Sequence, residues 1–269
     1  MSLWRSWGKR SVLPELTMLF DTALLQEVCK SVDAKGLVAG SKKLFHILCI
    51  PPVSAKGSCP QKGPTLIIAN HNGVFDTHLL LQTIKRTDYK FVALAIYKIF
   101  GKSVTTRLFP IYRHIPWLHR LYEFPLQYEI IGTFPTIYSH EEARVKNRKT
   151  IKQAVQWVSD GGALSLFPTG SVGTVTDGHK WKPGVGHLVK QITNSKTKVV
   201  FAHITGTRKS DVGAYFNSIF RPILFKPKQL LVQYSKSRLL SDLVNTKERG
   251  REIAQRLERE YNSLFPSGQ

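Results

Sequence analysis

Short apolar runs rich in β-branched residues alternate with amphipathic stretches along most of this chain. The runs predict strands at 66–69, 90–95, 163–167, 198–204 and 230–234. Helices are predicted at 76–84, 147–159, 184–194 and 246–264. Their expected inward faces include Ile151, Ala154, Val155 and Val158 in 147–159, and Ile253, Leu257, Tyr261 and Leu264 in 246–264. Because strands that alternate with helices form helix-covered sheets, we expect an α/β fold with a mixed, largely parallel central sheet covered on both faces.

The beginning of the chain departs from this pattern. Residues 1–50 predict an N-terminal helical extension, and a Pro/Gly-rich connector then leads into an α/β domain at 51–269. Within the extension, Leu37, Leu44, Ile47 and Leu48 fall on one helical face beside lysines. This arrangement suits either a helix lying in a membrane interface or a helix packed on the core. No run of about 18 apolar residues occurs, so no transmembrane span is predicted.

An abrupt change from apolar to polar residues after Ala69 marks the main candidate for chemistry. His71 follows a predicted strand, 72–73 predicts a turn, and Asp76 stands where it could cap the next helix. On one continuous helix, residues five apart are turned about 140° from each other, but across a strand–turn–helix corner they can meet. A carboxylate bound to one ring nitrogen of His71 would leave the other nitrogen to take a proton from a substrate hydroxyl.

Two other interpretations of these residues stay open. His71 and Asp76 could serve the backbone alone, because such residues are common at turns and helix caps. His71, Asp76 and His78 could instead bind a metal ion, although no cysteine cluster or second histidine pair supports this. We expect a site without a metal.

Five short segments occur in a fixed order. Asn70-His71 with Asp76 resembles the NHx4D motif of the PlsC-like glycerolipid acyltransferases, which comprise the 1-acylglycerol-3-phosphate and glycerol-3-phosphate acyltransferases. Residues 109–113 resemble the family's second motif, 166–171 the third (usually FPEGTR), 181–184 the following K-x-G segment, and 199–207 the fourth, a buried strand. The resemblance covers roughly residues 40 to 240.

The resemblance implies a reaction and a set of residues. An acyl group would move from acyl-CoA or an acyl carrier protein, as co-substrate, to a hydroxyl of a lysophosphatidic-acid-like or glycerol-phosphate acceptor in phospholipid biosynthesis or remodelling. His71 and Asp76 would be catalytic, and no bound cofactor is implied. The substrate-binding residues would be Arg113, which grips a phosphate, Lys182 as its helper, Thr169, and the backbone amides of Gly170 and Ser171.

The chain departs from the family pattern in two motifs. The Glu and Arg of the third motif are replaced by Thr169 and Val172, and the usual proline of the fourth motif is Phe201. In the family this Glu helps to hold the acyl acceptor. Its replacement therefore affects the identity of the acceptor more than the reaction.

A formal net charge of +21 points to an anionic partner. Between 178 and 240, twelve basic residues accompany one acidic residue, Asp211. An anionic membrane surface or a phosphorylated acceptor fits this field. Nucleic acid is not expected, because no zinc-finger, helix-turn-helix or aromatic ribonucleoprotein signature is present. The further basic cluster at 144–152 is most simply a solvated helix face.

The sequence thus predicts a peripheral membrane acyltransferase on the cytoplasmic face. The three cysteines are scattered, which favours a reducing compartment. The competing functions are a non-catalytic lipid-binding protein of the same fold and, third, a basic nucleic-acid-binding protein.

Overall fold

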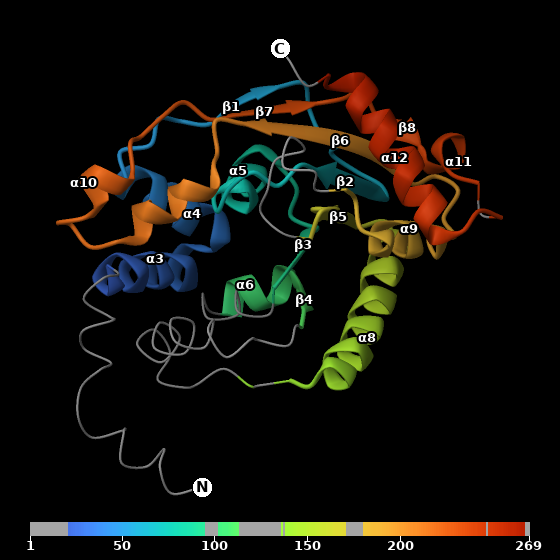
Figure 1. Cartoon of the computed structure of the whole chain (residues 1–269), viewed down its shortest axis with the longest axis horizontal. Helices are drawn as coiled ribbons and strands as arrows, with labels where there is room; N and C mark the ends of the chain where they lie inside the picture. The colour runs from blue at the N-terminus through green and yellow to red at the C-terminus, as the bar shows by residue number, and fades with distance from the viewer. Residues whose placement is uncertain are drawn as a thin grey trace, which may run out of the picture.

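The computed structural model describes residues 21–94, 102–112, 136, 138–170, 180–245 and 247–266. Within these residues an eight-stranded sheet forms the central layer, in the order β1-β7-β6-β2-β5-β3-β4 with β8 paired to β6 (Figure 1). The strands are β1 (Ser54–Lys56), β2 (Thr65–Ala69), β3 (Tyr89–Leu94), β4 (Leu108–Ile111), β5 (Ala163–Leu166), β6 (Lys198–Thr205), β7 (Leu231–Tyr234) and β8 (Arg238–Leu239).

Most strand pairs run parallel. β2 is parallel to both β5 and β6, β3 is parallel to β4 and β5, and β1 is parallel to β7. β7 and β8 pair with β6 in the antiparallel direction. The predicted mixed, largely parallel sheet is confirmed.

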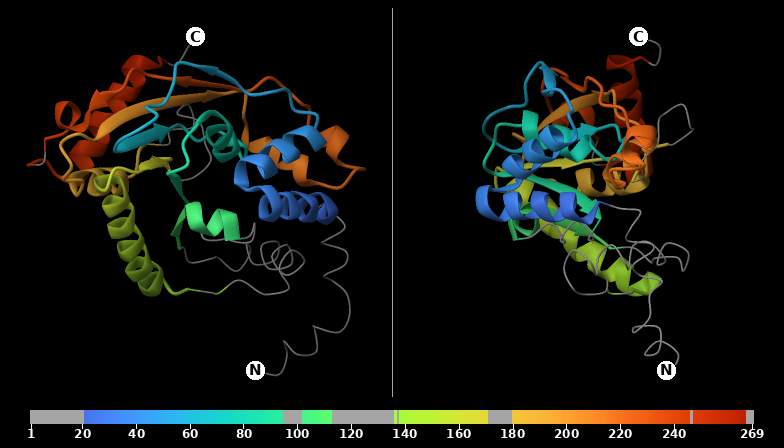
Figure 2. Two further views of the ribbon diagram at one scale, coloured as in Figure 1. Left: turned by 180° about the vertical axis from the view of Figure 1, so that it is seen from behind. Right: turned by 90° about the vertical axis from the view of Figure 1, so that its left-hand side faces the viewer.

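Helices cover both faces of the sheet (Figures 1 and 2). In β2, Ile67 and Ala69 belong to the core beneath α3, α4 and α5, whereas Leu66 and Ile68 belong to the core beneath α8, α9 and α12. A continuous apolar run suits such a strand, because both of its faces are buried. The helices are α3 (Thr22–Lys35), α4 (Leu37–Ile47), α5 (Asp76–Thr83), α6 (Lys102–Arg107), α8 (His140–Ser159), α9 (Pro183–Lys190), α10 (Arg221–Leu224), α11 (Leu240–Leu243) and α12 (Gly250–Leu264), with the 3-10 helix η3 (Lys209–Tyr215).

Several helix boundaries differ from the sequence prediction. α8 begins at His140 rather than at 147, because Ser139 and Glu142 form a reciprocal capping box that starts the helix earlier. α9 ends at Lys190 and α12 begins only at Gly250. The prediction that Leu264 faces inward is wrong, since its side chain is 42% exposed in the last turn of α12.

The segment 37–50, which suited either a membrane-interface helix or a helix packed on the core, packs on the core. Leu44 and Phe45 of α4 are buried in the same cluster as residues of α3 and α5, so the described part of 37–50 supports the packed alternative. Among the described helices, none has an apolar stretch long enough to cross a membrane.

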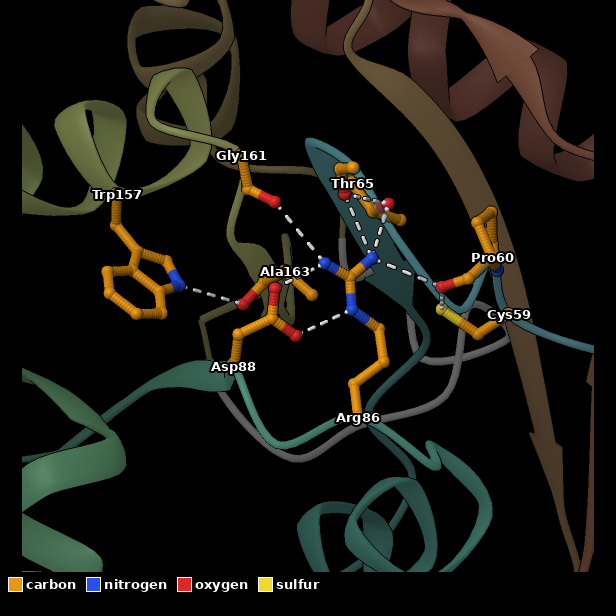
Figure 3. Close-up of polar contacts among 9 residues, drawn as sticks. Cys59, Pro60, Thr65, Arg86, Asp88, Trp157, Gly161 and Ala163 are labelled. Carbon is orange, nitrogen blue, oxygen red and sulfur yellow. Dashed lines mark hydrogen bonds and ion pairs between the residues drawn. The ribbon is translucent and has the colours of Figure 1, made fainter.

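A buried arginine fastens the amino ends of the parallel strands (Figure 3). The Arg86 guanidinium donates to the Gly63 carbonyl, to Thr65 Oγ1 at the start of β2, and to the Gly161 carbonyl before β5. It also pairs with Asp88, whose pKa it lowers chiefly by donating hydrogen bonds to the carboxylate. This cluster occupies one end of the sheet, and the His71 turn lies at the opposite, carboxyl end of β2.

Candidate active site

His71 and Asp76 meet at the corner between β2 and α5. His71 Nδ1 lies 2.8 Å from Asp76 Oδ2. The Asp76 side chain is fully buried, whereas the His71 side chain is 17% exposed. A strand that ends at Ala69 and a helix that begins at Asp76 bring the two side chains together across the turn, as their spacing allows.

The turn also fixes the carboxylate of Asp76. Oδ2 accepts hydrogen bonds from the backbone amides of Asn72 (2.6 Å) and Gly73 (2.9 Å) as well as facing the imidazole. The predicted capping role is therefore wrong: Phe75 is the N-cap residue, and the carboxylate points back into the turn instead of toward the first amides of α5. Oδ1 is buried and accepts no hydrogen bond from the described residues. A carboxylate held in this way is rigidly aimed at His71.

Phe167 controls the plane of the imidazole. Its ring stacks on that of His71 with a centroid distance of 4.3 Å and an interplanar angle of 17°. Phe167 follows β5, whose Leu166 is the register partner of Ile68, so the two rings emerge from neighbouring parallel strands at the same edge. Within the described residues no hydrogen bond occupies His71 Nε2.

Two asparagines lock this turn to β6. The side-chain amide of Asn70 donates through Nδ2 to the Ile204 carbonyl (2.8 Å) and accepts at Oδ1 from the Ile204 backbone amide (2.6 Å). The side chain of Asn72 donates to the same carbonyl. Sequence reasoning missed this role. Asn70 was visible as part of the motif, but its partner lies 134 residues away.

Gly73 is where the turn touches the loop after β6. A Cβ at this position would lie 2.7 Å from the Arg208 carbonyl oxygen and 2.9 Å from Thr207 Cβ. Only glycine lets the two backbones approach so closely.

His78 takes no part in this site. Its Nδ1 lies 3.2 Å from Ser41 Oγ and its ring contacts Phe45 on α4. Burial lowers the pKa of His78 to about 4. The alternative of a His71–Asp76–His78 metal site is not supported, because His78 is turned toward α4. In the described residues no three His, Cys, Asp or Glu side chains gather where a metal ion could bind.

The third motif forms a tight turn after β5. Thr169 is buried, at 3% exposure, and Gly170 adopts a left-handed conformation with φ of 68°. The Gly170 amide donates to the Phe167 carbonyl (3.1 Å). The Gly170 amide, one of the two predicted to bind an oxyanion or a phosphate, therefore also takes part in this turn. Ser171 lies outside the described residues.

Lys182 joins this turn to α9. Its amide donates to the Pro168 carbonyl (2.8 Å), its side chain is exposed, and a Cβ on Gly170 would lie 3.7 Å from its Cγ. The structure thus brings Lys182 beside the third motif, as the sequence order suggested. Arg113, the predicted phosphate ligand, lies outside the described residues.

A basic groove of about 850 Å3 runs between α8 and α9. His140, Arg144, Arg148 and Lys152 recur every fourth residue of α8 and form one wall, while Gly184 and His187 of α9 belong to the other. Among the described residues that line the groove, none is acidic. Arg144, Arg148 and Lys152 are exposed, as a solvated face requires, but they also form this wall, which the sequence reading did not anticipate.

Two of the predicted substrate-binding segments border the groove. Tyr112, which precedes Arg113, and Gly184, two residues after Lys182, both line it. Asn147 holds Tyr112 in place, because its side chain accepts from the Tyr112 amide and donates to the Tyr112 carbonyl. The groove is therefore the candidate site for the phosphate groups of a substrate.

Comparisons with known proteins bear on this site. A family model described as Acyltransferase matches residues 52–205. A search of curated proteins found no match. Among solved structures, the 1-acyl-sn-glycerophosphate (LPA) acyltransferase PlsC from Thermotoga maritima is similar to this chain with a TM-score of 0.45 and 17% sequence identity. The similarity covers 98% of this chain and 88% of that one.

The family match spans β2, the His71–Asp76 turn, the third motif and the whole of β6. It covers more than half of the sequence. The chain belongs to the acyltransferase family.

Proposed function

We propose that this protein transfers a fatty acyl group from acyl-CoA or an acyl carrier protein to a hydroxyl of a lysophosphatidic-acid-like or glycerol-phosphate acceptor at an anionic membrane surface. The observation that carries the proposal is the 2.8 Å contact between a buried Asp76 carboxylate and the Nδ1 of a partly exposed His71. Family membership supports acyl transfer in general. The acceptor, the donor and the pathway belong to the proposal.

His71 acts as the general base. Its Nε2 takes the proton of the acceptor hydroxyl while the hydroxyl oxygen attacks the thioester carbonyl. The tetrahedral intermediate then expels the thiolate, which recovers the proton from the imidazolium. Asp76 stabilises the imidazolium and keeps Nδ1 protonated in the resting state. Such a positioned base typically contributes about 10²–10⁴-fold to the rate.

Two features of the structure support this chemistry. Phe167 covers one face of the imidazole and limits its rotation, so Nε2 keeps one direction. The groove between α8 and α9 offers cations to the phosphates of the acceptor or of the donor. Arg113 and Lys182 are proposed to act with it, Arg113 as a bidentate phosphate ligand.

Thr169 bears on the choice of acceptor. It is short and neutral, so it offers a hydroxyl but neither the charge nor the reach of the glutamate usual in the family. We infer that Thr169 shifts the preference among these acceptors away from the one that the family's glutamate favours.

A thioester-consumption assay tests the function directly. Purified full-length protein is given acyl-CoA or acyl carrier protein with a panel of lysophospholipids or glycerol 3-phosphate, and the released thiol is measured. We expect release that depends on the acceptor, and a loss of about 10²–10⁴-fold in kcat for His71→Ala.

The control is His46→Ala, because His46 is exposed on α4; it should keep wild-type turnover. Retention of more than about a tenth of the activity by His71→Ala would remove the base. Absence of turnover with every acceptor, together with lipid binding, would favour a non-catalytic lipid-binding protein instead.

A further inference from the structure

Exposed apolar side chains cluster at one place on the surface. Of the eight large hydrophobic side chains that are exposed in the described residues, five lie within 212–224: Val212, Ile219, Phe220, Ile223 and Leu224. We call this set the α10 tip. Ile219 and Ile223 are 72% and 77% exposed. Single exposed hydrophobics are normal on a soluble protein, but a cluster in so short a segment marks an interaction surface.

The tip is a built surface. α10 packs against η3 so closely that a Cβ on Gly213 would lie 2.7 Å from Leu224 Cβ, which places Val212 next to α10. Arg221 Nε donates to the Phe216 carbonyl, and the Arg221 guanidinium pairs with Asp21 at the start of α3. These contacts fix α10 against η3 and the start of α3, while its apolar side chains stay exposed.

The border of the tip is positive. Between 206 and 230 the chain has five basic residues and one acidic residue, Asp211. Lys228 neutralises Asp211 with an Nζ to Oδ1 distance of 2.9 Å. Arg208 and Lys226 are exposed, and no ion pair engages them among the described residues. An apolar centre with a cationic border matches a bilayer with anionic headgroups. A second copy of the chain would instead oppose like charges.

The loop that carries the tip also supports the catalytic turn. Arg208, at the start of η3, is the residue whose backbone lies against Gly73. Phe225, directly after α10, is buried with its ring centroid 5.8 Å from that of Phe75, the N-cap residue of α5. Figures 1 and 2 place α10 beside α4, at the opposite end of the molecule from α12. A membrane bound at the tip would therefore lie against the same loop that packs on Gly73 and Phe75, in the turn that carries His71.

We propose that the α10 tip inserts into anionic membranes and docks the protein so that the catalytic turn faces a lipid acceptor. The proposal names the surface responsible for the membrane association that is part of the proposed function. It rests on the proposed function only for the purpose of the docking. The insertion itself requires no turnover.

Vesicle co-sedimentation of the full chain tests the insertion. Phosphatidylcholine vesicles and vesicles of phosphatidylcholine with 30% phosphatidylglycerol serve as probes. We expect Ile219→Ser combined with Ile223→Ser to weaken binding to the anionic vesicles by at least about tenfold, because two apolar side chains no longer enter the bilayer. Arg208→Glu combined with Lys226→Glu should abolish the preference for anionic over neutral vesicles.

The matched control is Val145→Ser, since Val145 is an apolar residue, 55% exposed on α8, that lies outside the α10 tip. It should bind vesicles like the wild type. Unchanged melting temperatures verify that all variants fold. Vesicle affinity of the double serine variant within twofold of wild type, or an equal loss in the control, would overturn the proposal. So would a wild-type dimer that becomes monomeric in the serine variant while vesicle binding stays intact, because the tip would then bind a second copy.

Turnover separates this proposal from the proposed function. With glycerol 3-phosphate in solution the double serine variant should release thiol at the wild-type rate, and with a lysophospholipid embedded in anionic vesicles it should be slower by about the loss in binding. If the wild type transfers no acyl group at all, the proposed function fails, and the vesicle measurements still decide the docking surface.

Discussion

Replacement of Asp76 by asparagine isolates the charge at the centre of the site. Oδ2 of Asp76 faces three donors, His71 Nδ1 and the amides of Asn72 and Gly73, whereas Oδ1 faces none among the described residues. In Asp76→Asn the amide oxygen should therefore take the Oδ2 position, because an NH2 group there would oppose two backbone N–H donors. The geometry of the turn survives, and the negative charge beside the imidazole is lost.

The expected effect follows from this geometry. For charge centres about 4 Å apart and an effective dielectric constant of about 20, the attraction between carboxylate and imidazolium is about 4 kcal/mol. Since about 1.4 kcal/mol corresponds to a tenfold change in rate, its loss lowers kcat by about 10³-fold, or about 10²-fold if the retained hydrogen bond compensates in part. The NH2 group at the buried Oδ1 position has no acceptor, which destabilises the fold by about 1–3 kcal/mol.

The assay is a double-mutant cycle on thiol release. Asp76→Asn is compared with wild type, and the same change is made in a His71→Ala background. If Asp76 acts through His71, the second Asp76→Asn should have almost no further effect on kcat, because residues that work as a unit are not additive. Urea unfolding reports the stability of each variant separately. An equal loss of kcat in both backgrounds would refute the reasoning, as would a single variant within about threefold of wild type.

Three further predictions concern other parts of the molecule. The pKa of His78 is about 4 in the folded protein and about 6.5 in the unfolded chain. The unfolding free energy should therefore fall by up to about 3 kcal/mol as the pH drops from about 6.5 to about 4. Urea unfolding should show that His78→Gln removes most of this pH dependence. Arg144→Glu combined with Arg148→Glu, in the wall of the groove, should raise the KM of a phosphorylated substrate about tenfold or more. Lys149→Glu, on α8 but outside the groove lining, should change this KM little. Equal KM values for the two variants would show that the groove does not bind the substrate. Thr169→Glu should shift the ratio of kcat/KM among acceptors, and a uniform loss for every acceptor would contradict its role in acceptor choice.

The central sheet and the corner at which His71 meets Asp76 were predictable because their signals are local. Leu66 to Ala69 form an uninterrupted apolar run, and a strand of that kind belongs between two helical layers. The residues that follow form the turn that leads from this parallel strand into a helix. The longer start of α8 also had a local signal, the Ser139 and Glu142 capping box, which apolar periodicity alone does not register.

Other features depend on contacts that no local pattern contains. Asn70 is satisfied by Ile204, and Arg86 by carbonyls of two distant loops, so neither role follows from nearby residues. The antiparallel pairing of β7 with β6 depends on the path of the chain between the two strands, and no residue pattern within the strands indicates it. The clustering of Ile219 and Ile223 with Val212 likewise needed the packing of α10 on η3.

The two departures from the family motifs have different physical meanings. Phe201, in place of the usual proline, lies 1% exposed in β6 and contacts Trp181 and Tyr261. Its amide donates to Ser235 Oγ, and its carbonyl accepts from the Ser235 amide. A proline has no amide hydrogen and could make only the second of these bonds. The change from proline to Phe201 is therefore accommodated by contacts within the layer below the site.

Thr169 removes the negative charge that the family usually has at this position. It is buried at 3% exposure, two residues after Phe167, whose ring stacks on His71. A buried glutamate requires a cationic partner, and the position of the motif's arginine is also neutral here, at Val172. The acid and the base of the third motif have been replaced together, which keeps the local charge balanced. The His71–Asp76 pair lies on a separate turn held by β6 and is left intact by this change. Under the proposed function, the difference from the family therefore falls on the recognition of the acceptor.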